Sequence, residues 1–241
     1  MNMKLYHLKN AADTSTVGTY PQLKFSNEHN PNYHVDADYS VRKISGKRRI
    51  TDNIKLPILQ TVKYARLTDY LSYSGPGSGE LLIFNGKIDL QNSGLNIDEF
   101  EKLPIQIIGK EQQHQYNAMQ FGTVRDIIHW SNSVFSIVPK EGYTFEGQHQ
   151  IWHELSEIQF ESKDSYLQWR RENRETDVTV IKKHLALNTA QWDVFRVSSP
   201  VFGVLCTDKF MNWVKSQGFT GFDFEAVQLD FRKVFVAAKV N

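Results

Sequence analysis

The chain has 241 residues, of which 40% are hydrophobic and 23% are charged. This is an ordinary globular composition and excludes a disordered chain. The 28 Lys and Arg nearly balance the 27 Asp and Glu, for a formal net charge of +1, so no global field attracts nucleic acid. The single cysteine excludes an internal disulfide, and no apolar run reaches the roughly 18 residues of a membrane span. The N-terminus also lacks the apolar stretch of a signal peptide. We therefore expect a folded cytoplasmic protein without a membrane partner.

The N-terminal part is predicted to contain loops and short strands. Residues 10 to 40 are rich in Asn, Asp, Ser, Thr and Tyr, which favours turns. The sequence LLIFNGKIDL at 81–90 predicts a β-hairpin, because Asn85 and Gly86 can both adopt the positive φ angles of a type I′ turn. The glycine-rich loop GPGSG precedes it at 75–79. We predict a strand- and loop-rich region over 1–95, which is a candidate subdomain, and an α+β domain over 96–241.

The middle of the chain alternates predicted strands with two helices. Asp98 is expected to open a short acidic helix that Pro104 ends. The expected strands cover residues 105–108, 115–121, 134–138 and 178–187, and the second helix covers 164–174.

Near the C-terminus the order is strand, helix, strand. The apolar segment 201–205 predicts a strand, and Thr207 is a suitable N-cap for the helix that follows. One face of this helix is expected to be buried through Phe210, Met211 and Val214.

The helix is expected to end at Gly218 in a left-handed conformation. Alternation of Val227, Leu229 and Phe231 with polar residues then predicts a final strand. Few helix-length segments separate the strands. The predicted fold class is therefore α+β, a mainly antiparallel mixed sheet with a few short helices packed on it.

Two histidines have the spacing of metal ligands on a helix. His149 and His153 are four residues apart in HQIWH, and Glu154 or Glu157 could complete a site. A metalloprotease helix carries Glu after its first His as the general base, whereas here that residue is Gln150. A metal-dependent enzyme built on these residues is an alternative, but we assign no catalytic residue, metal or cofactor and expect no enzymatic activity.

A basic cluster provides the other alternative, weak binding of nucleic acid. It contains Arg42, Lys43, Lys47, Arg48 and Arg49. A short basic turn without a second basic strip is more often a solvated loop, so no nucleic-acid partner is expected.

The remaining reactive residue types have no catalytic context. Cys206 closes an apolar strand without a charged neighbour in sequence, which favours a buried core residue. Ser198 and Ser199 lie outside a Gly-x-Ser-x-Gly elbow. The loop at 75–79 lacks the Gly-Lys-Ser/Thr that completes a phosphate-binding loop.

The predicted helix at 164–174 carries the candidate partner-binding residues. Trp169, Arg170, Arg171 and Arg174 combine an aromatic ring with guanidinium groups, residue types that dominate protein interfaces. The alternative is a solvated helix in which Glu172 and Glu175 pair locally with the arginines.

Four segments in order carry a resemblance to a known family. They are LPIQIIGKEQQHQYNAMQF at 103–121, VRDIIHWSNSVF at 124–135, DVFRVSS at 193–199 and VFGVLCTDKFMNWVKSQGFTGFDFEAV at 201–227. Together they resemble the Imm11 family, also called domain of unknown function 1629, which is found beside polymorphic toxins in bacteria. One departure is His129, where the family pattern has an acid before the Trp.

This resemblance implies an immunity protein. Such a protein binds and neutralises a cognate toxin domain by stoichiometric protein–protein interaction, without turnover.

Overall fold

The computed structural model describes residues 4–44, 49–109, 115–141, 143–146, 149–188, 191–198, 201 and 203–227. These residues form two compact units. The first contains the described residues up to Arg125 and those from Gln191 to Ala226, and the second contains the described residues from Asp126 to 188 together with Val227. The chain therefore leaves the first unit after Arg125 and returns to it at Gln191. The predicted subdomain boundary at 95/96 concerns independent folding and stays a prediction.

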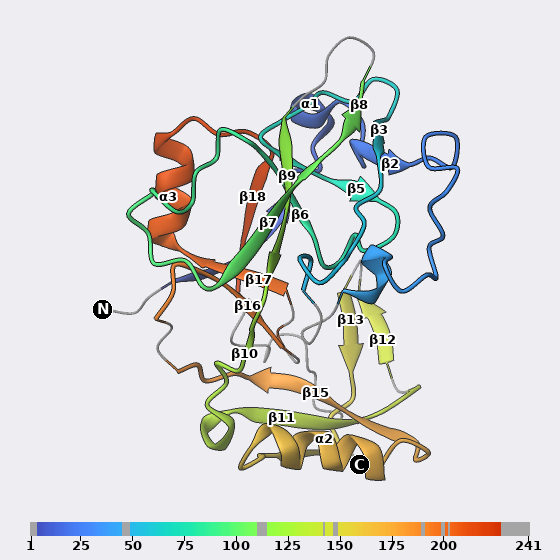
Figure 1. The fold of residues 1–241 in the computed structure, drawn as a ribbon. Helices are drawn as coiled ribbons and strands as arrows, with labels where there is room; N and C mark the ends of the chain where they lie inside the picture. The colour runs from blue at the N-terminus through green and yellow to red at the C-terminus, as the bar shows by residue number, and fades with distance from the viewer. Residues whose placement is uncertain are drawn as a thin grey trace. The chain divides into compact units, whose positions relative to one another are not determined.

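A five-stranded sheet of order β10-β16-β17-β1-β18 lies in the first unit (Figure 1). Its strands are β1 (Leu5–Asn10), β10 (Val124–Arg125), β16 (Val194–Val197), β17 (Gly203–Thr207) and β18 (Phe222–Ala226). Strand β1 pairs antiparallel with both β17 and β18, while β10 and β16 are parallel. The sheet thus combines the first strand of the chain with strands near its other end.

Helix α3 (Asp208–Ser216) packs on this sheet. Phe210 and Val214 are buried, as predicted, whereas Met211 is only half-buried. The ring of Phe210 lies 6.3 Å from the rings of both Phe222 and Phe224 of β18. Gly218 follows the helix with a φ of +66°, which confirms the left-handed position.

Thr207 occupies the N-cap position of α3 but does not cap it with its side chain. Its hydroxyl instead donates a hydrogen bond to Oδ1 of Asp193 at 2.9 Å. The predicted N-cap position is therefore confirmed, but its side chain does not cap the helix because a buried carboxylate competes for the hydroxyl.

Two four-stranded sheets complete the first unit. Their orders are β5-β2-β3-β8 and β4-β6-β9-β7. The strands are β2 (Leu23–Phe25), β3 (Leu59–Thr61), β4 (Tyr70–Leu71), β5 (Tyr73–Ser74), β6 (Leu82–Asn85), β7 (Phe100–Ile105), β8 (Ile107–Ile108) and β9 (Tyr116–Phe121). Helix α1 (Thr14–Val17) and the 3₁₀ helix η1 (Val41–Lys43) interrupt the surrounding loops. Strand β9 confirms the strand predicted at 115–121.

The hairpin predicted at 81–90 is wrong. Only its first half is a strand, β6, which pairs with β4 and β9. Neither Asn85 nor Gly86 takes a positive φ, and the N–H of Ile88 donates to the carbonyl of Asn85 at 2.9 Å. Ile88 and Leu90 instead pack as loop residues in the core beneath α3. Burial of these two side chains therefore favours a loop over the predicted second strand.

The helix predicted from Asp98 is also wrong. Residues of this segment form β7, which pairs along its whole length with β9. Pro104 lies within β7, which is an edge strand and so tolerates a missing N–H. Of the predicted strand 105–108, only Ile107 and Ile108 form a separate strand, β8.

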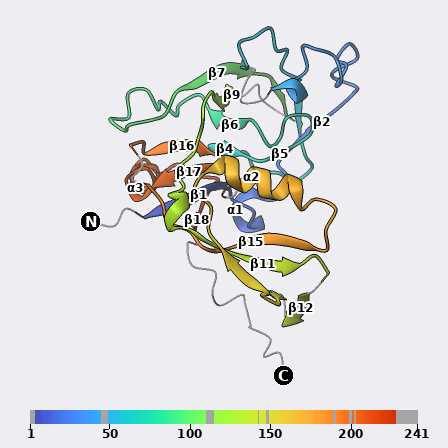
Figure 2. The same cartoon turned by 90° about the horizontal axis from the view of Figure 1, so that it is seen from below.

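The second unit consists of two small sheets, the 3₁₀ helix η2 (Trp130–Asn132) and helix α2 (Lys163–Glu172). One sheet has the order β14-β11-β15 and the other is the hairpin β12-β13. Their strands are β11 (Val134–Pro139), β12 (Tyr143–Glu146), β13 (His149–Trp152), β14 (Ser156–Ile158) and β15 (Val178–His184). Strands β11 and β15 and helix α2 confirm the predictions for these segments (Figure 2).

The fold is α+β, as predicted, with several mixed and antiparallel sheets and three short helices in the described residues. The final strand predicted around Leu229 and Phe231 lies outside those residues. Within the described part of the chain, none of the helices has the length and apolar character needed to cross a membrane.

Candidate functional site

Helix α2 and the turn that follows it hold the four predicted partner-binding residues on a well-anchored scaffold. Ser162 caps its N-terminus, and reciprocal hydrogen bonds between Ser162 and Ser165 form a capping box. Tyr166 is buried, with its ring 5.5 Å from Phe135 of β11 and 5.2 Å from Trp130. These contacts fix the helix to the β11 sheet, so the side chains on its other face have a defined position.

Trp169 is half-buried at the edge of this aromatic cluster. Its ring meets Phe160 edge to face, with 6.4 Å between the centroids. The carbonyl of Trp169 accepts hydrogen bonds from the backbone N–H and the side-chain amide of Asn173. One part of the indole therefore packs against Phe160, and the rest is exposed to solvent.

Arg170, Arg171 and Arg174 are all exposed at the C-terminal end of α2 and just beyond it. The guanidinium of Arg170 lies over the Tyr166 ring at 5.8 Å. Cations at this end of a helix are favoured by its dipole. The structure thus places three exposed guanidinium groups at the end of the helix that also carries the half-buried Trp169.

Local pairing engages few of these charges. Arg174 lies 3.7 Å from Glu175, but both side chains are more than four-fifths exposed, and such a contact contributes little. Glu172 accepts a hydrogen bond from Gln168 at 2.7 Å, and no ion pair joins it to an arginine within the described residues. The guanidinium groups of α2 therefore keep most of their hydrogen-bonding capacity for another molecule.

The first unit contains a separate cavity of about 550 Å³. Its apolar walls come from β1, β6, β9, β10, β16 and β17, and its lining includes Leu8, Leu82, Phe121, Val197 and Val204. Ser78 and Gly79 of the glycine-rich loop and Ser198 also line it.

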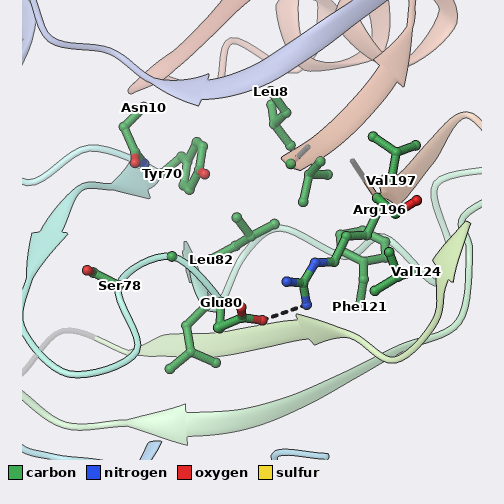
Figure 3. Close-up of a pocket in the computed structure, with 15 residues that line it drawn as sticks. Leu8, Asn10, Tyr70, Ser78, Glu80, Leu82, Phe121, Val124, Arg196 and Val197 are labelled. Carbon is green, nitrogen blue, oxygen red and sulfur yellow. Dashed lines mark ion pairs between the residues drawn. The ribbon is translucent and has the colours of Figure 1, made fainter. Parts of the chain in front are cut away.

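An ion pair between Glu80 and Arg196 crosses this cavity (Figure 3). Oε2 of Glu80 and Nη1 of Arg196 are 2.6 Å apart, and the side chains are only 30% and 18% exposed. Asn10 and Tyr70 lie together at another side of the cavity. Burial raises the pKa of Tyr70 far above its ordinary value, opposed only in part by the Asn10 amide, so its hydroxyl is neutral.

The candidate metal ligands do not share a helical face. His149 belongs to strand β13, which ends at Trp152, and its side chain lies outside the described residues. Glu154 and Glu157 both accept hydrogen bonds from Lys183. No group of three potential ligands capable of holding a metal is present among the described side chains.

The basic cluster at 42–49 is partly neutralised. Arg42 pairs with Asp36 at 2.8 Å, and Arg49 contacts Glu99 and Glu101 at 2.7 and 3.0 Å. Lys47 and Arg48 lie outside the described residues.

Cys206 is fully buried, as predicted for a core residue. Burial raises the pKa of its thiol to about 12, so it stays protonated at neutral pH.

Sequence reasoning missed the cavity. Glu80 follows the glycine-rich loop and Arg196 lies in β16, and only the tertiary fold brings them together. The local signal was limited to the flexible loop at 75–79. In comparisons with known proteins, no family model matches the chain, and no curated protein matches it significantly.

Proposed function

We propose that this protein is an immunity protein that binds a bacterial toxin domain and neutralises it by occupying its surface. The helix α2 surface, defined as Trp169, Arg170, Arg171 and Arg174, is the proposed docking site. The observation that carries this proposal is the set of exposed guanidinium groups at the end of the helix that carries the half-buried Trp169. The Imm11-like segments of the sequence supply the expectation that the partner is a toxin.

Because helix α2 is already fixed in place, a partner can bind it with little loss of conformational entropy. The capping box and the buried ring of Tyr166 hold the helix before a partner arrives. Association costs free energy for every side chain and loop that must be ordered, so a fixed helix reduces this cost. Trp169 is already partly immobilised against Phe160 and presents a rigid aromatic edge.

Charge chemistry indicates the kind of surface that fits. Guanidinium groups bind carboxylates through two parallel hydrogen bonds. Arg170 and Arg171 make no ion pair within the described residues, and Arg174 makes only the weak contact with Glu175. The complementary toxin surface therefore carries Asp or Glu side chains, or a substrate-phosphate site that the arginines fill.

The test is a charge reversal measured against the toxin domain encoded beside this gene. Arg170→Glu combined with Arg174→Glu should weaken toxin affinity at least tenfold, because repulsion replaces attraction. Co-expression of the wild-type protein should rescue host cells from the toxin, and the double variant should rescue them less well.

A matched control reverses two exposed lysines of the first unit, Lys24→Glu with Lys43→Glu. This control changes the net charge equally and should leave affinity unchanged. Equal weakening by both double variants would indicate a nonspecific charge effect. Unchanged affinity in a folded α2 variant would place the interface elsewhere, and a neighbouring protein that is not toxic would contradict the function itself.

A further inference from the structure

The cavity of the first unit has the size and the walls of a small-molecule site. Its volume of about 550 Å³ falls within the roughly 300–1,000 Å³ of typical ligand pockets. Leu8, Phe121 and Val197 of its lining are buried, and Leu82 and Val204 add partly buried apolar surface. An apolar group entering this space would be removed from water on several sides.

The charges that line the cavity cancel. Among the described residues that line it, Glu80 and Arg196 are the one pair of opposite charge, and the others are neutral. A ligand with one net charge would leave that charge uncompensated in a largely buried site, which is costly. A ligand without net charge avoids this cost.

The Glu80–Arg196 ion pair is close but poorly aligned. The two atoms are 2.6 Å apart, yet neither Oε2 of Glu80 nor Nη1 of Arg196 makes a hydrogen bond, and both are shielded from solvent. Buried charged groups are stabilised most when their hydrogen bonds are also satisfied. Both members of the pair line the cavity and therefore retain hydrogen-bonding capacity that a ligand there can use.

A neutral donor group lies at the other side. Nδ2 of Asn10 is buried and makes no hydrogen bond of good geometry within the described residues, although the Asn10 side chain and Tyr70 lie close enough to interact (Figure 3). Buried polar groups normally have partners. A carbonyl oxygen of a ligand would satisfy the Asn10 amide.

From these features we propose that the cavity binds a zwitterionic ligand with apolar side chains, of the class of short apolar peptides with free termini. The ligand carboxylate pairs with Arg196 and its ammonium group with Glu80. One misaligned ion pair is thereby replaced by two, and the charge in the cavity stays balanced. The apolar side chains lie against Leu8, Phe121 and Val197, and a peptide carbonyl accepts from Asn10.

This site is independent of the helix α2 surface, because all its residues belong to the first unit. Its test requires no toxin. The probe is the dipeptide Leu-Leu, and titration calorimetry on the full chain measures its affinity. Three capped forms separate the contributions: acetyl-Leu-Leu keeps only the carboxylate, Leu-Leu-amide keeps only the ammonium, and acetyl-Leu-Leu-amide keeps neither.

The expected order of affinity is free Leu-Leu first, with each singly capped peptide at least tenfold weaker. Absence of Leu-Leu binding would overturn the proposal. Equal binding of the doubly capped peptide would also overturn it, because the cavity would then recognise apolar groups alone. These comparisons use the wild-type protein and do not depend on a variant that folds.

A double variant tests the residues. Glu80→Gln with Arg196→Gln removes both charges at nearly constant volume and should weaken Leu-Leu binding at least tenfold. The matched control is Asp36→Asn with Arg42→Gln, which removes an exposed ion pair of the same unit and should leave binding unchanged. Thermal unfolding verifies that both variants are folded. Undiminished binding to a folded Glu80/Arg196 variant would contradict the assignment of these residues.

Discussion

Arg125 and Asp98 form a two-point ion pair in the core of the first unit. Nε of Arg125 donates to Oδ2 of Asp98 at 3.0 Å, and Nη2 contacts Oδ1 at 2.7 Å. The Asp98 side chain is 1% exposed, and the guanidinium stacks over Trp192 at 4.2 Å. Both oxygens of a buried carboxylate are therefore compensated in one planar arrangement.

Removing one partner of this pair should be strongly destabilising. Arg125→Met leaves the buried carboxylate unpaired and should lower the free energy of unfolding by about 3 kcal/mol. Arg42→Met is the control, since its pair with Asp36 is mostly exposed, and it should cost less than about 1 kcal/mol. Urea denaturation measures both. Similar losses would show that the Arg125–Asp98 pair is not the origin of the effect.

Helix α3 should depend on Phe210. This side chain is 1% exposed and contacts the rings of Phe222 and Phe224. Phe210→Ala should lower the free energy of unfolding by about 3–5 kcal/mol, because it leaves a cavity in the core. Met211→Ala on the half-buried side of the same helix should cost clearly less. A change below about 1 kcal/mol for Phe210→Ala would contradict the packing of α3.

The Glu154–Lys183 cluster should make the second unit sensitive to acid. Burial acts to raise the pKa of Glu154, but hydrogen bonds from Lys183 and Ser136 outweigh it and hold the pKa below its ordinary value of 4.5. A lowered folded-state pKa gives stability that is present above the unfolded-state pKa. This stability is lost as the pH falls through the folded-state pKa.

The same cluster acts in the opposite sense at high pH. Burial acts to lower the pKa of Lys183, but Glu154 and Glu157 raise it above 10.5, so the contribution of Lys183 to stability is lost as the pH rises through its folded-state pKa.

The acid sensitivity can be measured with the variant Glu154→Gln. Chemical denaturation at about pH 7 and about pH 3 should show a smaller difference in the free energy of unfolding in this variant than in the wild type. An unchanged difference would assign the acid sensitivity to other groups.

Two glycines with nearly the same φ angle should respond differently to alanine. Gly18 and Gly94 have φ angles of +72° and +71°. A Cβ at Gly18 would overlap the carbonyl oxygen of Tyr64, whereas nothing lies within 4 Å of one at Gly94. Gly94→Ala should cost about 1–2 kcal/mol for the left-handed conformation alone. Gly18→Ala should cost more, and equal melting temperatures would contradict the close approach at Tyr64.

Local sequence pattern predicted the elements whose residue types favour their own secondary structure. Strands β9, β11 and β15 and helices α2 and α3 are of this kind. The helix predicted from Asp98 was wrong because Asp98 is buried in an ion pair with the distant Arg125. The residues that follow it are extended because they pair with β9. The hairpin predicted around Asn85 was wrong because Ile88 and Leu90 pack in the hydrophobic core as loop residues, without forming a second strand.

The two candidate sites differ in how far they could be predicted, because only one of them is formed by residues that are close in sequence. Residues of the helix α2 surface are neighbours in sequence, so one predicted helix was enough to group them. The cavity is assembled from β1, β6, β16 and the loop before β6. Nothing in the sequence near Glu80 identifies Arg196 as its partner, because that information lies in the strand order.

The position of β1 between β17 and β18 has a consequence for synthesis on the ribosome. Leu5–Asn10 is synthesised long before both of its neighbours, Gly203–Thr207 and Phe222–Ala226. Both edges of β1 therefore lack their native partners until those strands are made, and contacts this distant in sequence form slowly. Nascent chains arrested before residue 203 should consequently expose β1 to proteases and chaperones, and release of the full chain should bury it.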